Sequence, residues 1–182
     1  MRKLANAELN RKSVEDYKKT KKIPVTVVLD NVRSLNNIGS VFRTCDAFMI
    51  ESLFLCGITA TPPHREIHKT ALGATESVRW QYIEDTKDAV SFLRSAGYVI
   101  CAVEQTDCSI MLNDFRLVPG EKYAFIFGHE IHGVDQEVVN ACNLSIEIPQ
   151  LGTKHSINVA VSAGIVLWEV FRYYIKDMIP RS

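Results

Sequence analysis

The regular alternation of strand-like and helical segments most constrains the fold of this 182-residue chain. Apolar, β-branched runs typical of buried strands occur at 24–30, 52–56, 78–83, 98–103, 123–127 and 144–148. Helices are predicted at 6–18, 37–48, 66–72, 86–96, 135–141 and 157–176. Strands separated by helices pair in parallel, so we expect an α/β fold whose parallel sheet is covered by helices on both faces.

Composition is that of an ordinary globular domain, with 47% hydrophobic and 23% charged residues. The formal net charge is zero, which argues against holding nucleic acid through bulk charge but permits a local basic patch. One candidate patch is a basic N-terminal extension over 1–23, which equally fits a solvated helix face and charged linker. Its basic residues are Arg2, Lys3, Arg11, Lys12, Lys18, Lys19, Lys21 and Lys22.

The cysteines predict a cytoplasmic protein, because they are odd in number, lie among apolar residues and lack paired spacing. They are Cys45, Cys56, Cys101, Cys108 and Cys142. The chain shows neither a leader-like N-terminus nor an uncharged apolar run of about 18 residues, so we expect no membrane association.

Histidine spacing gives little support for a metal. His64 and His68 have the i, i+4 spacing of a ligand pair but no third ligand beside them. His129 and His132 flank Glu130 in a loop bounded by glycines. We expect no metal site.

The segment 152–161 leads from a Gly-containing loop into a helix that is apolar on nearly every side. Such helices are buried, in a core or against another subunit. Ser156 and Asn158 would then lie at the helix N-terminus, where free backbone N–H groups gather. They fit a simple helix cap and also a binding site.

Polar, Gly-containing loops follow three predicted strands, at 31–40, 128–133 and 149–158. Ligands of open parallel sheets bind beyond the carboxyl ends of the strands, so these loops are expected to meet in one crevice. Neither the dinucleotide fingerprint nor the P-loop motif is present, which disfavours those two kinds of site.

Three side chains in these loops have both a structural and a functional reading. Arg43 fits a surface pair with Asp46, or a two-pronged grip on a phosphate near a strand end. Asn37 fits a helix N-cap or a side-chain role in the site. Glu130 fits a solvated loop carboxylate or a site residue.

Four segments resemble motifs of the SpoU (TrmH) family of RNA 2′-O-ribose methyltransferases, in the SPOUT superfamily. They are DNVRSLNNIGSVFRTCDAF (30–48), HKTALGATE (68–76), FIFGHEIHGVD (125–135) and IEIPQLGTKHSINVAVSAGIVLWE (146–169). Their order and spacing match over about 24–175. The chain departs from the family pattern at Met49, usually Gly, and at Ile157, usually Leu.

The resemblance implies a methyltransferase domain over 24–182 with a C-terminal trefoil knot, a homodimer and S-adenosylmethionine as the cofactor. By motif, the expected catalytic residues are Asn37, Arg43, Glu130, Ser156 and Asn158. The expected cofactor-binding residues are Val103, Glu104, Gly128, Ile148, Leu151, Gly152 and Ile157. General rules would have disfavoured a knot, which is very rare.

The implied reaction is methyl transfer to a ribose 2′-hydroxyl of tRNA or rRNA. A hydroxyl is a poor nucleophile, so catalysis needs in-line placement and help with removing one proton. Arg43 would bind the neighbouring phosphate and assist that removal; its high pKa leaves open which group finally takes the proton. Two alternatives remain: methylation of a base nitrogen, and a non-catalytic RNA-binding dimer.

Overall fold

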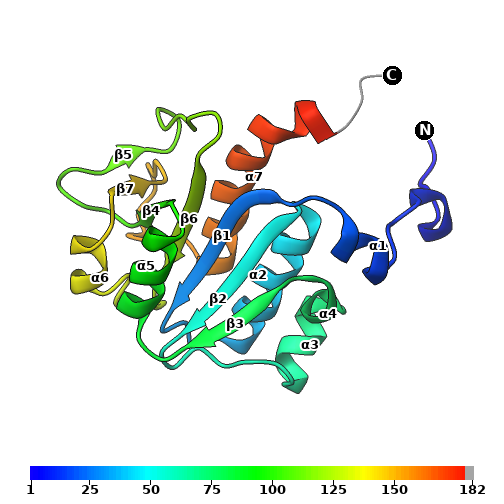
Figure 1. Ribbon diagram of the computed structural model, residues 1–182, viewed down its shortest axis with the longest axis horizontal. Coiled ribbons are helices and arrows are strands. Elements are labelled where there is room, and N and C mark those ends of the chain that lie inside the picture. The colour runs from blue at the N-terminus through cyan, green and yellow to red at the C-terminus, as the bar shows by residue number, and fades with distance from the viewer. Residues whose placement is uncertain (179–182) are drawn as a thin grey trace.

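The computed structural model describes residues 1–178 and contains a seven-stranded sheet (Figure 1). Neighbouring strands follow the order β3-β2-β1-β6-β4-β7-β5, and all the pairs are parallel. The predicted parallel α/β sheet is therefore confirmed. The strands are β1 (Ile23–Asp30), β2 (Ile50–Cys56), β3 (Trp80–Ile83), β4 (Tyr98–Val103), β5 (Ile110–Met111), β6 (Lys122–Phe127) and β7 (Leu144–Glu147).

Helices cover both faces, as expected, and the two groups lie on opposite sides of the sheet in Figure 1. One face carries α2 (Leu35–Ala47), α3 (Arg65–Ala71), α4 (Ala74–Ser77) and α7 (Val159–Met178). The other face carries α5 (Thr86–Ser95) and α6 (Gln136–Asn140).

The side-chain alternation of β1 explains why the sheet has a core on each face. Val25, Val27 and Leu29 belong to the larger core beneath α2 and α7, whereas Val28 belongs to the core beneath α5. All four are fully buried, which accounts for the continuous apolar run in the sequence.

The register aligns the carboxyl ends of the central strands. Leu29 of β1 pairs with Phe127 of β6, and Ile126 pairs with Ala102 of β4. Val103 in turn pairs with Ile146 of β7. The loops that follow these strands consequently leave the sheet at one edge.

The predicted continuous helix over 6–18 is wrong. The segment forms a 3-10 helix, η1 (Asn6–Leu9), and a separate α1 (Val14–Lys19). Asn10 breaks it with a φ of 46°, and Ser13 starts α1 by accepting a hydrogen bond from the backbone N–H of Asp16. Tyr17 then anchors α1, because its ring is buried and its hydroxyl donates to the carbonyl of Cys45.

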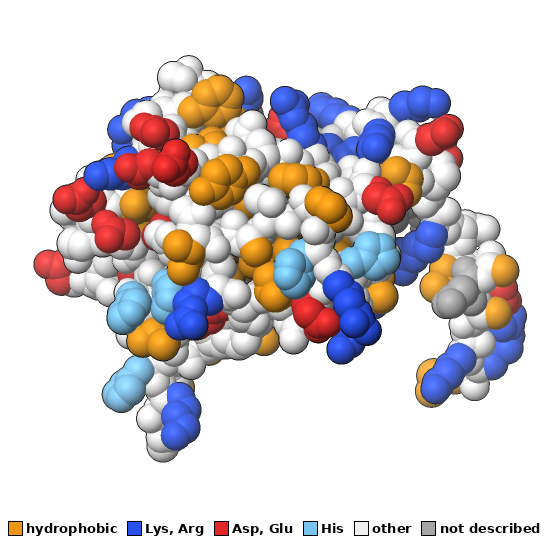
Figure 2. Space-filling view, turned by 90° about the horizontal axis from the view of Figure 1, so that it is seen from below, with side chains coloured by type: hydrophobic (Ala, Val, Ile, Leu, Met, Phe, Trp, Pro, Cys, Tyr) orange, Lys and Arg blue, Asp and Glu red, His pale blue; other side chains and the backbone are white. Residues whose placement is uncertain are grey.

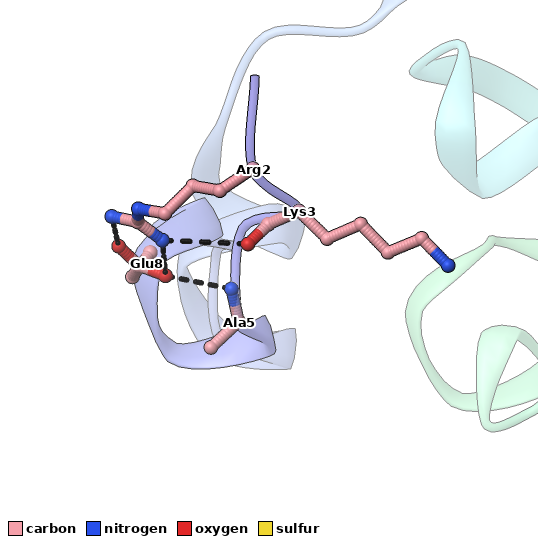
Figure 3. Close-up of polar contacts among 4 residues, drawn as sticks. All are labelled: Arg2, Lys3, Ala5 and Glu8. Carbon is pink, nitrogen blue, oxygen red and sulfur yellow. Dashed lines mark hydrogen bonds and ion pairs between the residues drawn. The ribbon is translucent and has the colours of Figure 1, made fainter.

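The first residues extend away from the sheet and make mainly local contacts. The Arg2 guanidinium grips both carboxylate oxygens of Glu8, at 2.5 and 2.9 Å, and the backbone N–H of Ala5 donates to the same carboxylate (Figure 3). This pairing offsets the Arg2 charge within the segment.

Two short elements escaped prediction. β5 has two exposed residues, and α4 has one turn after the left-handed Leu72 and Gly73, so neither leaves a periodic pattern. The substitution at Met49 also has a structural consequence. Met49 follows Phe48, the C-cap of α2, and has a φ of 56°, the left-handed conformation in which glycine is usual.

α7 starts at Val159, with Asn158 as its N-cap. One side of α7 is buried at Ala163, Val166 and Leu167, while Val161 and Trp168 are 51% and 47% exposed. Within one chain the helix is therefore covered on one side only. No helix in the described residues is long and apolar enough to cross a membrane.

Candidate functional site

The loops at the carboxyl edge enclose a cleft of about 530 Å³. Its walls come from the ends of β4, β6 and β7, the loop after β6, and the segment that leads into α7. The predicted convergence is confirmed for two of the three polar loops, 128–133 and 149–158. The third, 31–40, does not line the cleft, and the end of β4 takes its place in the wall.

Glu130 ties the loop after β6 to the loop after β1. Its carboxylate accepts hydrogen bonds from the backbone N–H groups of Arg33 at 3.0 Å and Ser34 at 2.9 Å. Ser34 is the N-cap of α2, so the carboxylate lies beside the start of that helix. Glu130 is thus not a freely solvated loop residue.

Asn37 and Asn158 extend this contact into a chain of side-chain hydrogen bonds. The Asn37 amide donates to Glu130 over 3.1 Å, and the Asn158 amide donates to Asn37 Oδ1 over 3.1 Å. The Asn158 Oδ1 also accepts from the backbone N–H groups of Ala160 and Val161. The cap of α2 is Ser34, so the Asn37 side chain serves this network instead.

The environment of Glu130 favours its charged form. Burial acts to raise the pKa of Glu130, but hydrogen bonds from the Arg33 and Ser34 backbone and from Asn37 outweigh burial and hold the pKa below its ordinary value. The carboxylate is therefore ionised at neutral pH.

Most of the expected cofactor-binding residues line the cleft: Val103, Glu104, Gly128, Ile148 and Ile157. Ser156 and Asn158 line it as well. Leu151 and Gly152 do not line it; they lie exposed in the loop after β7. Ser156 precedes the cap of α7 rather than forming it.

Glu104 holds the loop after β6 against the end of β4. Its carboxylate accepts from the backbone N–H of Val134 at 3.0 Å and from that of Gln105 at 2.9 Å. Gly133 permits this approach, since a Cβ there would lie 2.1 Å from Glu104 Oε2. In the sequence, only the position of Gly133 at the end of the polar loop points to this role.

Gln105 ties down the loop that leads into α7. Its amide donates to the carbonyl of His155 over 2.9 Å, next to Ser156. A glutamine just past a strand belongs to no special pattern, so this contact is not predictable from the sequence.

Arg43 lies outside the cleft of its own chain. It is exposed in a separate hollow with Ser40, Lys69 and Gly164, on the α7 side of α2. The structure shows no ion pair between Arg43 and Asp46, whose carboxylate instead accepts a hydrogen bond from Ser77. The structural reading of Arg43 as a surface pair is therefore wrong.

The cleft lacks the kind of positively charged side chain that Arg43 carries. Within the described part of the chain, the cleft lining includes Glu104, Glu130 and Glu147 but neither Lys nor Arg. The carboxylates suit a cationic ligand, and the lining offers no guanidinium or ammonium group to hold a phosphate.

Two of the histidines that were weighed as metal ligands, His64 and His129, make local hydrogen bonds. His64 caps α3 by accepting from the backbone N–H of Glu66, and His129 Nδ1 accepts from the N–H of Ile131. Among residues 1–178, no group of three metal-ligating side chains is arranged to hold a metal ion.

Comparison with known proteins identifies the same region. The sequence model of the SpoU rRNA Methylase family matches residues 24–168. The tRNA (guanosine(18)-2′-O)-methyltransferase of Thermus thermophilus is 31% identical, over 93% of this chain and 85% of that protein. A 23S rRNA (guanosine-2′-O-)-methyltransferase of Nitrosomonas europaea is 30% identical over 81% of this chain and 56% of its own length.

Solved structures share the fold. An AdoMet-bound rRNA methyltransferase from Sinorhizobium meliloti superposes with a TM-score of 0.77 and 25% identity, over 89% of this chain and 60% of that one. The TrmH/SpoU tRNA modifying enzyme of A. aeolicus gives a TM-score of 0.78 at 24% identity, over 91% and 82% of the two chains.

Proposed function

The chain belongs to the SpoU rRNA methylase family, and we propose from this that it transfers a methyl group from S-adenosylmethionine to a ribose 2′-hydroxyl of tRNA or rRNA. The observation that carries the assignment to this chain's own residues is the hydrogen-bonded series Glu130–Asn37–Asn158. It joins three of the four motif segments at the rim of one cleft.

The cleft suits the cofactor in size and chemistry. Its volume, about 530 Å³, lies in the range of small-molecule sites. Apolar Val103, Ile148 and Ile157 offer surfaces for an adenine ring, and the carboxylates favour a positively charged sulfonium. When bound there, S-adenosylmethionine supplies an activated methyl group.

We assign positioning roles to the residues of the series. Glu130 fixes the start of α2 relative to the cleft, and Asn37 passes that constraint to Asn158. Ser156 is exposed beside them, free to bind substrate. Leu151 and Gly152 are proposed to contribute through their backbone, from the loop beside the cleft. Such fixed placement is what an in-line reaction of a weak nucleophile requires.

Arg43 is proposed to grip the phosphate next to the target ribose and to assist removal of the 2′-hydroxyl proton. Its guanidinium can form two parallel hydrogen bonds to a phosphate, which a lysine cannot copy. Since the guanidinium is a poor base, the phosphate or another neighbouring group shares the proton.

We propose that Arg43 serves the cleft of a second copy of the chain. Two observations support this: Arg43 lies outside its own cleft, and the hollow around it borders α7 at Gly164. The same helix exposes Val161, Ile165 and Trp168. Pairing two copies through this apolar face would cover it and bring each Arg43 toward a partner's cleft.

We also propose the domain bounds, the knot and the location of the protein. The main domain spans 24–182, preceded by the basic extension 1–23, and the family resemblance implies a trefoil knot in the C-terminal half. The position of β7 between β4 and β5, followed by α7 packed on the α2 face, supports that path. Cysteines without disulfides support a cytoplasmic location.

The test is methyl transfer from labelled S-adenosylmethionine to tRNA and rRNA taken from a strain lacking the gene, followed by mass spectrometry of the nucleosides. We expect label in a 2′-O-methylribose nucleoside, at one position. Label in a base would support the base-nitrogen alternative. Tight cofactor and RNA binding without transfer would support the non-catalytic dimer.

A further inference from the structure

A second cleft, of about 530 Å³, lies beside α3 and shares no lining residue with the hollow of Arg43 or with the site described above. The 61–64 turn, α3 and the start of β3 form its walls. Pro62, Pro63, Ile67 and Trp80 make the wall apolar, and the polar side chains around it are His64, Arg65, His68, Thr75 and Glu76.

Trp80 supplies a fixed aromatic surface in this cleft. It starts β3, which is one of the two edge strands of the sheet, and is partly exposed. Its ring meets Phe42 edge to face, with centroids 6.4 Å apart and planes at 84°. A tryptophan held from one side and open on another is a suitable platform for stacking a planar ring.

Basic side chains lie on both sides of the cleft. Lys18, Lys22 and Arg79 line a neighbouring hollow that shares Trp80 with it. On the other side, α3 carries Lys69 into the hollow of Arg43. Arg65 and Lys69 are four residues apart, so they lie on one face of α3.

Few acidic groups offset these cations. The carboxylates lining the three hollows are those of Glu51 and Glu76, and Glu66 reaches Lys69 at 3.8 Å in an exposed, weak pair. The protein has zero net charge, so this excess is local. Seen from below, His side chains lie in the lower half of the view together with several Lys and Arg side chains, and further Lys and Arg side chains lie along the upper margin (Figure 2).

We propose that the cleft at Trp80 holds an unpaired nucleobase of the substrate RNA, stacked on the indole ring. The phosphates of the same strand would run past Arg65 and Lys69 toward Arg43. Proteins read single-stranded RNA through stacked, splayed-out bases beside cations that bind the backbone. This inference rests on the proposed RNA methyltransferase function and adds a binding site to it.

The direct test uses the fluorescence of Trp80. The chain has two tryptophans, so Trp168→Phe leaves Trp80 as the only emitter. A short single-stranded RNA is titrated into this variant beside an abasic strand of equal length, while the anisotropy of a labelled end reports binding of each. We expect both strands to bind and only the base-containing strand to quench Trp80. Equal quenching by both strands, or binding without quenching, would overturn the proposal.

A second arm uses exposed charges, which avoids disturbing the core. Arg65→Ala should weaken RNA binding about 5-fold at low salt and raise the KM for RNA while kcat is unchanged. Arg94→Ala, on α5 across the sheet, removes the same charge and should change neither. If Arg94→Ala weakens binding as much as Arg65→Ala, the effect is bulk charge and the site is refuted.

The two hypotheses fail in different ways. Normal methyl transfer with no Trp80 quenching would contradict the nucleobase site alone. Saturable quenching without transfer of a methyl group to any RNA would contradict the proposed enzymatic function alone.

Discussion

Glu130 shows how one side chain can organise a site made from distant parts of the chain. Its carboxylate takes two backbone hydrogen bonds from the loop after β1 and one from Asn37. Removing the charge leaves backbone donors with a poorer acceptor, and the cost of that loss depends on pH.

Glu130→Gln should lower the free energy of unfolding by about 1 kcal/mol at pH 7, reduced from a buried value because the group is partly exposed. The folded-state pKa of Glu130 is below its ordinary value of 4.5, so this stability is present above that pH and lost as the pH falls through the folded pKa. Chemical denaturation of both proteins at pH 7 and pH 3.5 should show that the difference in unfolding free energy between wild type and variant is smaller at pH 3.5. An advantage that is the same at both pH values would contradict the assignment.

Met49 shows a cost of a single departure from the family pattern. It holds a left-handed φ of 56° at the end of α2. Met49→Gly should raise the unfolding free energy by about 0.5 kcal/mol, the steric relief exceeding the entropy cost of glycine. Chemical denaturation measures this; a less stable variant would mean that packing of the Met49 side chain outweighs the strain.

At the scale of elements, the close approach of α2 and α3 sets where Asn37 and Arg43 lie. Gly39 makes it possible, because a Cβ there would lie 2.1 Å from Thr70 Oγ1 and 2.4 Å from the carbonyl of Ile67. The contact includes backbone, so side-chain rotation alone cannot relieve it.

Gly39→Ala should therefore destabilise the protein by about 2 kcal/mol and also lower kcat, since α2 must shift. Gly152→Ala is the matched stability control, because no atom lies within 4 Å of its added Cβ. Thermal unfolding of the two variants gives the stability comparison, and methyl-transfer kinetics of Gly39→Ala against wild type test the shift of α2. Equal melting temperatures for Gly39→Ala and wild type would show that α2 and α3 can move apart to admit the added Cβ at no cost in stability.

The elements also show what the sequence could predict. Buried strands such as β1 and β4 were found almost to the residue, because burial on both faces demands an unbroken β-branched run. The predicted N-terminal helix is too long because the polar pattern continues through Asn10, whereas the backbone turns there with a φ of 46°. β5 is too short to leave a pattern.

Part of the site was predictable because its position follows from the strand order. Loops at strand ends follow from the topology, so the meeting of Glu130, Asn37 and Asn158 could be expected in outline. The side-chain hydrogen bonds between them, and the separate hollow of Arg43, depend on how α2 is rotated about its axis. No residue pattern records that rotation.

For the whole molecule, the half-covered α7 predicts assembly. Sedimentation should give a dimer of about twice the 20.5 kDa chain mass at micromolar concentration. Trp168→Asp, which places a charge on the exposed face, should shift the protein toward monomers and reduce activity with them. A wild-type protein that stays monomeric would contradict the shared-site proposal.

We propose that each working site combines the cleft of one chain with Arg43 of another. Methyl transfer to RNA is measured for mixed dimers of Arg43→Ala with a Ser156→Ala, Asn158→Ala double variant, co-expressed with two different tags. Each homodimer should be inactive, and the mixed dimer should regain one of two sites, close to half of wild-type activity. A mixed dimer as inactive as its parents would show that the site is built within a single chain.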